Sequence, residues 1–392
     1  MRLAHLADPH LGVRQYHRQT PSGINQREAD VARAFRLAVD GVIAARPDAV
    51  VVAGDLFHSV RPTNAAIVFA FKQFQRLREA LPRAPIVLVA GNHDTPRSVE
   101  TGSILRLFEE IGVDVAADDA RRLEYPQLDL SVLGVPHQAL VAGERPSLRP
   151  EGDAKYRIMV LHGEIEGVLP TERHTIEYGG ALVGLRELGS EEWTYVALGH
   201  YHVQHQVKPN TWYSGSLEYV GTNIWGELAD EADAGIRGKG WLLVDLDRVR
   251  VTRESVPASR PIIDLEPVRG EGLGADALDK QIGERLRAIP GGVADRIVRL
   301  RVYDVPRHVA RELDHAAIRA YKAEALHLHL DIRRPELQRT VGVGSPGRRQ
   351  TLPELVRDYL SHRPLPAELD REEFVRLGTD LMDSVERDLA GT

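Results

Sequence analysis

The fold is decided by the stretch Val52-Ala53-Gly54-Asp55-Leu56-Phe57-His58, in which an apolar run ends directly in a glycine, a carboxylate and a histidine. The run from Ala49 to Ala53 is short and rich in β-branched residues, which is typical of a strand buried on both faces of its sheet. Helical patterns lie on either side of it, over residues 26–46 and 64–80. Because apolar strands alternate with helices, the sequence predicts an α/β fold with a largely parallel sheet.

Four other segments repeat this arrangement of an apolar run followed by metal-ligand residue types. They are Leu6-Ala7-Asp8-Pro9-His10, Val89-Ala90-Gly91-Asn92-His93-Asp94, Val160-Leu161-His162-Gly163 and Leu198-Gly199-His200-Tyr201-His202. Open α/β sheets bind ligands at the carboxyl ends of their strands, so the five polar segments should meet at one edge. A single histidine after a strand is usually just hydrogen-bonded, and a lone Gly-Asp usually marks a turn. Five such segments in order indicate a metal site instead.

The spacing within these segments also predicts their local geometry. Asp8 and His10 should lie on the same side of an extended segment, as should His200 and His202, because side chains alternate along a strand. Pro9 should keep Asp8 extended. Glycines next to the ligands should let the backbone turn sharply beneath a crowded site, and these are Gly54, Gly91 and Gly199.

The residue composition restricts the chemistry of the site. The chain has no cysteine, which excludes disulfides and thiolate ligands. Carboxylate, amide oxygen and imidazole ligands suit octahedral Mn²⁺ or Fe²⁺. The formal net charge of −7 is unlike that of a protein that coats nucleic acid, although metal ions and a few local arginines can offset repulsion at one face.

The overall composition is that of an ordinary globular protein, with 43% hydrophobic and 27% charged residues. No apolar run approaches the roughly 20 residues of a membrane span, and the N-terminus lacks a signal-peptide cleavage pattern. We therefore expect no membrane association and a cytoplasmic location.

The length predicts more than one domain, because 392 residues exceed the roughly 250–300 at which a single core stops growing. Residues 1–258 become richer in strands toward their end, which predicts two sheets packed as a sandwich with helices outside. Residues 259–338 predict a small α+β domain with one helix over 274–289 and another over 306–321. Residues 339–392 contain a Gly/Pro-rich linker followed by two amphipathic helices.

Most other histidines do not share the context of the five segments. We expect these to be core or surface residues: His5, His137, His174, His205, His308, His315, His327, His329 and His362. His17 lies in the loop after the first segment and stays undecided.

The ordered series Asp-x-His, Gly-Asp, Gly-Asn-His-Asp, His and Gly-His-x-His resembles the calcineurin-like metallophosphoesterase superfamily, over roughly residues 1–218. Within that superfamily, Gly54-Asp55-Leu56-Phe57-His58 resembles the SbcD family, the bacterial nuclease partners of the SMC-like ATPase SbcC. The resemblance implies a metallophosphoesterase β-sandwich flanked by helices, a small α+β capping domain, and C-terminal helices that dock the ATPase.

The resemblance also implies a centre of two divalent ions, Mn²⁺ first, with Mg²⁺ or Fe²⁺ as alternatives. The implied ligands of one ion are Asp8, His10, Asp55 and His202. Those of the other are Asn92, His162, His200 and again Asp55, which would bridge the two. By the same resemblance His93 would act at the scissile phosphate, Asp94 would orient its imidazole, and His58 would help to position the substrate.

The implied function is DNA cleavage in double-strand-break repair, recombination and replication. The activities would be a 3′-to-5′ exonuclease on duplex ends and an endonuclease on single strands or hairpins. The chain would act as a homodimer within a heterotetramer with the ATPase, associated with the nucleoid. Since the sequence has no Gly-x-x-x-x-Gly-Lys-Ser/Thr motif, any ATP dependence must come from that partner.

Two other functions remain open at the level of the sequence. One is a phosphoesterase that uses the same metals on proteins, cyclic nucleotides or other small phosphates, and a substrate panel would separate it from a nuclease. The other is a protein that mainly tethers DNA ends, although every expected ligand is retained.

Two surfaces are candidates for contacts with DNA and with the partner. Loops after the first three segments carry four arginines that form a possible ring around the phosphates: Arg14, Arg18, Arg61 and Arg97. The last helix carries an apolar stripe suited to docking: Phe374, Leu377, Leu381, Val385 and Leu389. Alternatively, the arginines are ordinary surface residues, and the two tail helices pack on each other or on the catalytic domain.

Overall fold

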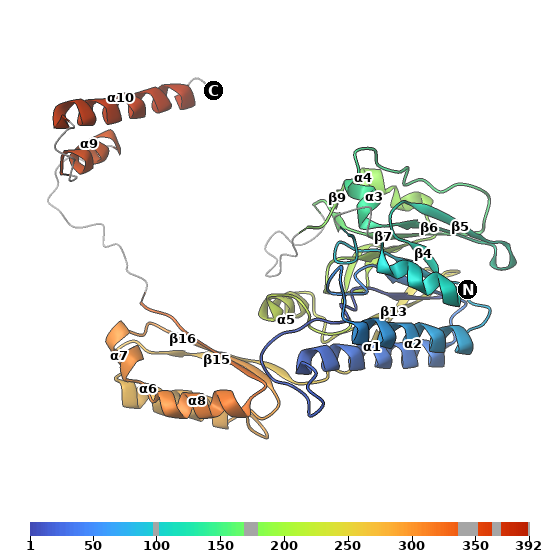
Figure 1. The fold of residues 1–392 in the computed structure, drawn as a ribbon, viewed down its shortest axis with the longest axis horizontal. Helices are drawn as coiled ribbons and strands as arrows, with labels where there is room; N and C mark the ends of the chain where they lie inside the picture. The colour runs from blue at the N-terminus through green and yellow to red at the C-terminus, as the bar shows by residue number, and fades with distance from the viewer. Residues whose placement is uncertain (97–101, 168–178, 336–351, 363–369, 391–392) are drawn as a thin grey trace. The chain divides into compact units, whose positions relative to one another are not determined.

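The computed structural model describes residues 1–96, 102–167, 179–335, 352–362 and 370–390. The chain divides into two compact units, Met1–Arg334 and Pro335–Thr392. The first unit contains two six-stranded sheets and a three-stranded sheet. Figure 1 shows the elements of each unit. Within the described residues, no helix combines the length and apolarity needed to cross a membrane.

The first large sheet has the strand order β14-β13-β1-β2-β3-β4. Its parallel strands are β1 (Arg2–Leu6), β2 (Ala49–Ala53), β3 (Ile86–Val89) and β4 (Asp114–Ala116). Two antiparallel strands complete it, β13 (Gly240–Asp245) and β14 (Arg250–Ser255). Every residue of β2 and β3 is buried, as expected for strands covered on both faces.

The second large sheet has the order β11-β12-β10-β7-β6-β5. Its parallel strands are β6 (Leu130–Val135), β7 (Tyr156–His162), β10 (Tyr195–Gly199) and β12 (Thr211–Tyr213). The antiparallel edges are β5 (Arg121–Tyr125) and β11 (His205–Lys208).

The two sheets pack face to face around an apolar core that includes Val51, Val89 and Val160. The outer face of the first sheet is covered by α1 (Gln26–Ala45), α2 (Asn64–Ala80) and the 3-10 helix η2 (Ile104–Ile111). Short elements cover the second: α3 (His137–Val141), β8 (Glu164–Ile165), β9 (Leu182–Val183), α4 (Leu185–Leu188) and η4 (Ser190–Glu192). The 3-10 turn η3 (Pro126–Leu128) joins β5 to β6. The predicted α/β sandwich with helices outside is confirmed.

Helix α1 begins where the sequence provides a cap. The Asn25 side chain accepts hydrogen bonds from the backbone N–H groups of Arg27 and Glu28, and the helix ends at Arg46 in a left-handed conformation. Figure 1 shows α1 and α2 lying side by side beneath the first sheet. Their apolar faces, which include the fully buried Phe35 and Phe74, pack against the face of that sheet that points away from the second sheet.

The two sheets approach each other closely at the carboxyl ends of β2 and β10, and glycines make this approach possible. A Cβ atom on Gly199 would lie 1.7 Å from the carbonyl oxygen of Ala53. A Cβ on Gly54 or on Gly91 would lie 2.0 Å from His162 Nδ1 or from Asp55 Oδ1, respectively. Among the three, Gly54 also has a positive φ, of 90°. The glycines therefore serve close packing as much as the predicted turns.

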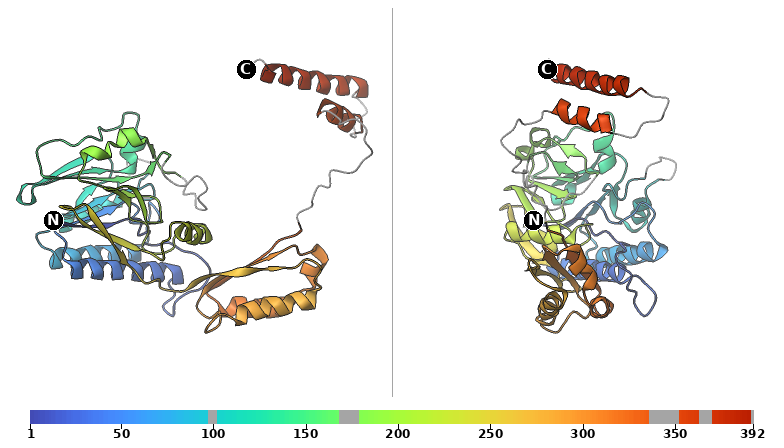
Figure 2. Two further views of the ribbon diagram at one scale, coloured as in Figure 1. Left: turned by 180° about the vertical axis from the view of Figure 1, so that it is seen from behind. Right: turned by 90° about the vertical axis from the view of Figure 1, so that its left-hand side faces the viewer.

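The three-stranded sheet forms a module with helices on one face, seen from two further directions in Figure 2. Its parallel strands are β15 (Ile262–Arg269), β16 (Ile297–Tyr303) and β17 (His327–Ile332), and its first helix is α6 (Ala275–Arg287). The single helix predicted over 306–321 is wrong. Two helices occupy this stretch, α7 (Arg307–Glu312) and α8 (His315–Glu324), because Asp314 between them accepts hydrogen bonds from two backbone N–H groups and starts a new helix.

This module contacts the sandwich through polar and aromatic side chains. Arg260, at the start of the module, lies 2.9 Å from Asp30 of α1. The ring of Tyr16 stacks on His327 at a centroid distance of 4.0 Å. A small apolar cluster around Trp225 of α5 (Ile224–Asp233) extends to Ile297 of β16. The sandwich and the module accordingly form one compact unit.

The second unit consists of α9 (Leu352–His362) and α10 (Arg371–Ala390), which pack on each other. The Arg371 guanidinium donates to the Ser361 carbonyl at 2.6 Å. In the predicted stripe, Phe374 is partly buried, whereas Leu377 and Leu381 are 68% and 67% exposed. The side chains of Val385 and Leu389 and the predicted linker at 339–349 lie outside the described residues.

The close approach of the sheets gives a testable prediction. Gly199→Ala should lower the free energy of unfolding by at least about 3 kcal/mol, because the new Cβ would overlap a backbone oxygen that cannot move aside. Gly143→Ala is the control, since nothing lies within 4 Å of a Cβ at that position. Thermal unfolding of the metal-free proteins measures the difference. A Tm equal to that of the unaltered chain for Gly199→Ala would contradict the close approach.

Candidate metal centre

The structure brings the five polar segments together at one end of the sandwich, as the strand-end argument predicts. Three groups of side chains have their ligand atoms within 4.8 Å of one another. They are Asp8, His10 and His202; Asp8, Asp55 and His162; and His10, His58 and His93. Asn92 and His200 join them through the hydrogen bonds described below. All seven predicted ligands therefore lie in one cluster.

Asp55 lies at the centre of this cluster and is fully buried. Its Oδ1 accepts the backbone N–H of His93 at 2.8 Å. Its Oδ2 has no hydrogen-bond partner among the described residues, yet lies 3.6 Å from His10 Nε2 and 3.4 Å from His162 Nε2. A buried carboxylate oxygen enclosed by imidazole nitrogens on two sides is suited to bind a cation between them.

The histidines are oriented by the groups behind their rings. His162 donates from Nδ1 to the Ala53 carbonyl at 2.9 Å, which leaves Nε2 as the nitrogen that faces Asp55. The same Nε2 lies 2.9 Å from Asn92 Oδ1, and His200 Nδ1 lies 3.2 Å from that amide oxygen. Such fixed tautomers are typical of histidines that bind metals.

The opposite side of the cluster is formed by Asp8, His10 and His202. The Nε2 atoms of His10 and His202 lie 3.1 Å apart. Both carboxylate oxygens of Asp8 accept the backbone N–H of His200 at 3.1 Å, and Oδ1 is 3.7 Å from His162 Nδ1. Asp8, His10 and His202 are each at most 2% exposed.

Four of the predicted ligands have a strained backbone. The φ angles are 50° at Asp8, 48° at His10, 49° at Asp55 and 104° at His200. The prediction of an extended segment through Asp8 and His10 is therefore wrong. After β1 the chain instead turns to follow the Gly54 segment, with hydrogen bonds from Asp8 N to Gly54 O and from His10 N to Asp55 O. Left-handed non-glycine residues cost about 1–3 kcal/mol each and gather at functional sites.

The charges of the cluster also favour a cation. Burial raises the pKa of Asp8 to about 7. Burial alone would lower the pKa of His162, but the Asp55 and Asp8 carboxylates and the hydrogen bond to the Ala53 carbonyl together outweigh burial and raise the pKa to about 10. Without a metal, the two buried carboxylates are thus compensated by protons, which a divalent ion would displace.

The residues present fit divalent metal ions. With bonds of about 2.1 Å, ligand atoms around one ion lie about 3 Å apart. The separations of 2.9–3.6 Å among Asp55 Oδ2, His10, His162, His202 and Asn92 are of this size. Oxygen and imidazole donors without thiolate suit Mn²⁺, Fe²⁺ or Mg²⁺.

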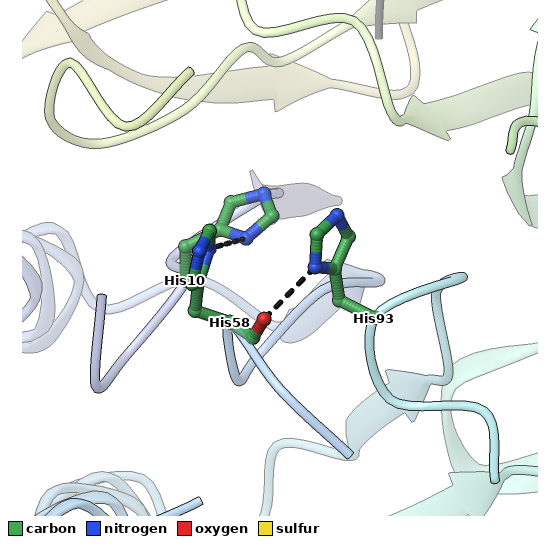
Figure 3. A group of neighbouring side chains, drawn as sticks. All are labelled: His10, His58 and His93. Carbon is green, nitrogen blue, oxygen red and sulfur yellow. Dashed lines mark hydrogen bonds between the residues drawn. The ribbon is translucent and has the colours of Figure 1, made fainter. Parts of the chain in front are cut away.

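Next to this cluster lies a second group of histidines, shown in Figure 3. His58 Nδ1 lies 3.3 Å from His10 Nδ1, on the edge of the His10 ring opposite Nε2. His93 donates from Nδ1 to the His58 carbonyl at 2.9 Å, and the two rings stack at 5.2 Å. His58 therefore orients both His10 and His93.

The Asp94 carboxylate accepts three backbone hydrogen bonds. Its Oδ1 accepts the backbone N–H of Phe57, and its Oδ2 accepts those of Leu56 and Gly91, at 3.0–3.1 Å. His93 Nδ1 donates to the His58 carbonyl, and the orientation of that imidazole by Asp94 stays a prediction. Asp94 thus holds the two ligand-bearing loops together through their backbones.

A cleft of about 980 Å³ opens beside the cluster and is partly lined by His58, Asn92 and His93. His137, predicted to be a core or surface residue, also lines this cleft. It is 9% exposed and its Nδ1 has no hydrogen-bond partner among the described residues. His137 follows β6 directly after Val135-Pro136, so the rule of a histidine after an apolar run would have found it.

The structure describes three of the four predicted arginines, and each has different neighbours. Arg14 is paired with Glu28 at 2.8 Å. Arg18 donates to backbone carbonyls at the end of α8, including that of Ala325 at 3.0 Å, so it joins the sandwich to the module. Arg61 is exposed beside a second surface cavity, and Arg97 lies outside the described residues.

Comparison with known proteins agrees with this geometry. The family model described as calcineurin-like phosphoesterase matches residues 1–219. The DNA double-strand break repair protein Mre11 of Sulfurisphaera tokodaii is 31% identical over 52% of this chain and 49% of its own length. The protein of that name from Methanocaldococcus jannaschii is 28% identical over 62% of each chain. The matches thus span about half to three fifths of these relatives. On the strength of the family match, this chain belongs to the calcineurin-like phosphoesterases.

Proposed function

We propose that the chain is a metal-dependent DNA nuclease that hydrolyses phosphodiester bonds, of the kind that the SbcD resemblance implies. The observation that carries the proposal is the buried Asp55 carboxylate, whose Oδ2 lies between the Nε2 atoms of His10 and His162. DNA as the substrate is supported by the relatives, which are named as DNA double-strand break repair proteins. The cleft beside His93 offers room for a nucleotide.

The proposed ligands form two sets that share Asp55. One set is Asp8, His10, Asp55 and His202, and the other is Asp55, Asn92, His162 and His200. When bound, two divalent ions, Mn²⁺ in our proposal, would activate a water molecule and neutralise charge on the phosphate. The cluster of mixed carboxylate, amide and imidazole donors supports this division.

The residues outside the ligand sets would act on the substrate. His93 is held by the His58 carbonyl through Nδ1, so Nε2 on the other edge of its ring can donate a proton to the leaving oxygen. His58 maintains this orientation and also supports His10. Asp94 would keep the ligand loops in register without touching the substrate.

We also propose that the second unit docks an SMC-like ATPase, within an assembly that contains two copies of this chain. Leu377 and Leu381 are exposed on the same face of α10, four residues apart, which suits a helix laid against a partner. The packing of α9 on α10 buries part of the stripe, so Phe374 contributes less to this surface than predicted.

The function is tested by removing the proposed bridging ligand. Asp55→Asn should reduce the Mn²⁺ content below two per chain and lower cleavage of duplex and hairpin DNA by about 10³-fold or more, because a neutral amide cannot offset the ions. Asp153→Asn, at an exposed aspartate, is the control. Elemental analysis and assays on end-labelled DNA measure both effects. Two full equivalents in the Asp55 variant, or an unaltered chain that hydrolyses phosphoproteins but no DNA, would contradict the proposal.

The role of His93 predicts a purely catalytic defect. His93→Ala removes the imidazole but keeps the backbone N–H that Asp55 Oδ1 accepts, so the ligand cluster should survive. We expect kcat to fall about 10²- to 10⁴-fold while metal content stays the same and KM for DNA changes little. Steady-state kinetics and metal analysis measure these quantities. Loss of metal from this variant would show that His93 belongs to the ligand cluster.

The docking surface predicts a defect in assembly alone. Replacing both Leu377 and Leu381 by glutamate should weaken binding of the ATPase from the same organism by about 30-fold or more, while basal nuclease activity is unchanged. Arg376→Gln is the matched control, because that side chain is exposed on the same helix. Binding is measured by titration of the purified partners. Unaltered affinity in the double variant would exclude this face of α10 as the docking surface.

A further inference from the structure

A cluster of buried charges lies directly behind one of the proposed ligands. It consists of Glu227 and Glu231 on α5 and of Lys239, just before β13, and each is at most 4% exposed. Lys239 Nζ lies 2.5 Å from Glu227 Oε2 and 3.1 Å from Glu231 Oε1. None of these residues belongs to the five polar segments, and no step of the proposed reaction uses them.

This charge cluster contacts His202 at two points. Glu227 Oε1 lies 3.7 Å from His202 Nδ1, which is within ion-pair distance but longer than a hydrogen bond, and Lys239 donates to the His202 carbonyl at 3.0 Å. The other ring nitrogen, Nε2, faces His10 Nε2 at 3.1 Å. The imidazole of His202 therefore lies between the proposed metal centre on one side and a buried carboxylate on the other.

The position of Glu227 is fixed closely. Its Oε1 accepts the Gly221 backbone N–H at 2.7 Å, and a Cβ on Gly221 would lie 2.5 Å from the same oxygen. Its other oxygen, Oε2, accepts a hydrogen bond from the buried Lys239 ammonium. Contacts on both oxygens thus hold the carboxylate in place.

If stability were its only role, this cluster of buried charges would be an unfavourable choice. Burying charges is costly, and apolar side chains of similar volume often stabilise a protein as well or better. Two buried glutamates against one lysine also leave an excess negative charge. That negative charge lies beside the His202 ring, whose far edge faces the proposed cations. Its attraction to those cations is favourable.

We propose that Glu227, anchored by Lys239, is a positioning residue that orients His202 through Nδ1 and strengthens its Nε2 as a metal ligand. A carboxylate behind a ligating histidine fixes the tautomer and raises the basicity of the ring, and its loss typically lowers metal affinity by about 10- to 100-fold. The inference rests on the metal centre of the proposed function.

Glu231 supplies a matched control on the same helix. It shares the Lys239 partner and is 3% exposed, but its Oε2 accepts the Tyr219 hydroxyl at 2.7 Å and the Gly238 N–H at 3.2 Å. No contact recorded for Glu231 reaches His202. A purely structural role for the charge cluster would therefore give Glu227→Gln and Glu231→Gln similar effects.

The experiment compares both variants with the unaltered full-length chain. Mn²⁺ affinity is measured by equilibrium dialysis with elemental analysis on stripped protein, and the Tm of each metal-free form is recorded in parallel. Glu227→Gln should weaken the affinity of one Mn²⁺ site about 10- to 100-fold, whereas Glu231→Gln should change it less than about 3-fold even if its Tm falls as far.

Two outcomes would overturn the inference. One is unaltered Mn²⁺ affinity in Glu227→Gln, and the other is an equal loss of affinity in both variants. If the unaltered chain itself binds no Mn²⁺, the proposed metal centre fails first, so the two failures are distinguishable.

Discussion

The carbonyl oxygen of Ala53 lies where the carboxyl ends of β2 and β10 approach each other, and the site depends on it. On one side it lies so close to Gly199 that a Cβ there would approach to 1.7 Å. On another side it accepts the hydrogen bond from His162 Nδ1, which turns the opposite ring nitrogen toward Asp55. The residues that follow strands of both sheets thus lie together in the ligand cluster. Without that contact, the ligands would lie on two separate edges.

Bringing these ligands together costs free energy, which other interactions in the fold must offset. Two buried carboxylates, several imidazoles and four residues at positive φ are unfavourable for a protein that binds nothing. The surroundings hold them by backbone hydrogen bonds, such as those from three amide groups to Asp94. A divalent cation would reverse the electrostatic part of the cost. Stability and function are therefore coupled at this end of the sandwich.

The fold class and the gathering of the predicted ligands follow from the sequence, because both are properties of strand ends, and the family match supports the fold class. The backbone conformation of the ligand segments could not be predicted from the sequence. The turn at Asp8 and His10 is imposed by hydrogen bonds to a segment far along the chain. The backbone role of Asp94 and the buried charge of Glu227 depend on contacts with equally distant segments. His137 also follows an apolar strand, β6, and lines the cleft, so the strand-end pattern extends to a sixth segment.

The central claim is that converging strand ends form a dinuclear metal centre around Asp55. X-ray diffraction from a crystal of the chain soaked in Mn²⁺, recorded at the manganese absorption edge, locates such ions directly. The account predicts two anomalous peaks, both within bonding distance of the Asp55 carboxylate, one beside His10 and His202 and the other beside His162 and Asn92. A single peak, or peaks away from Asp55, would contradict it.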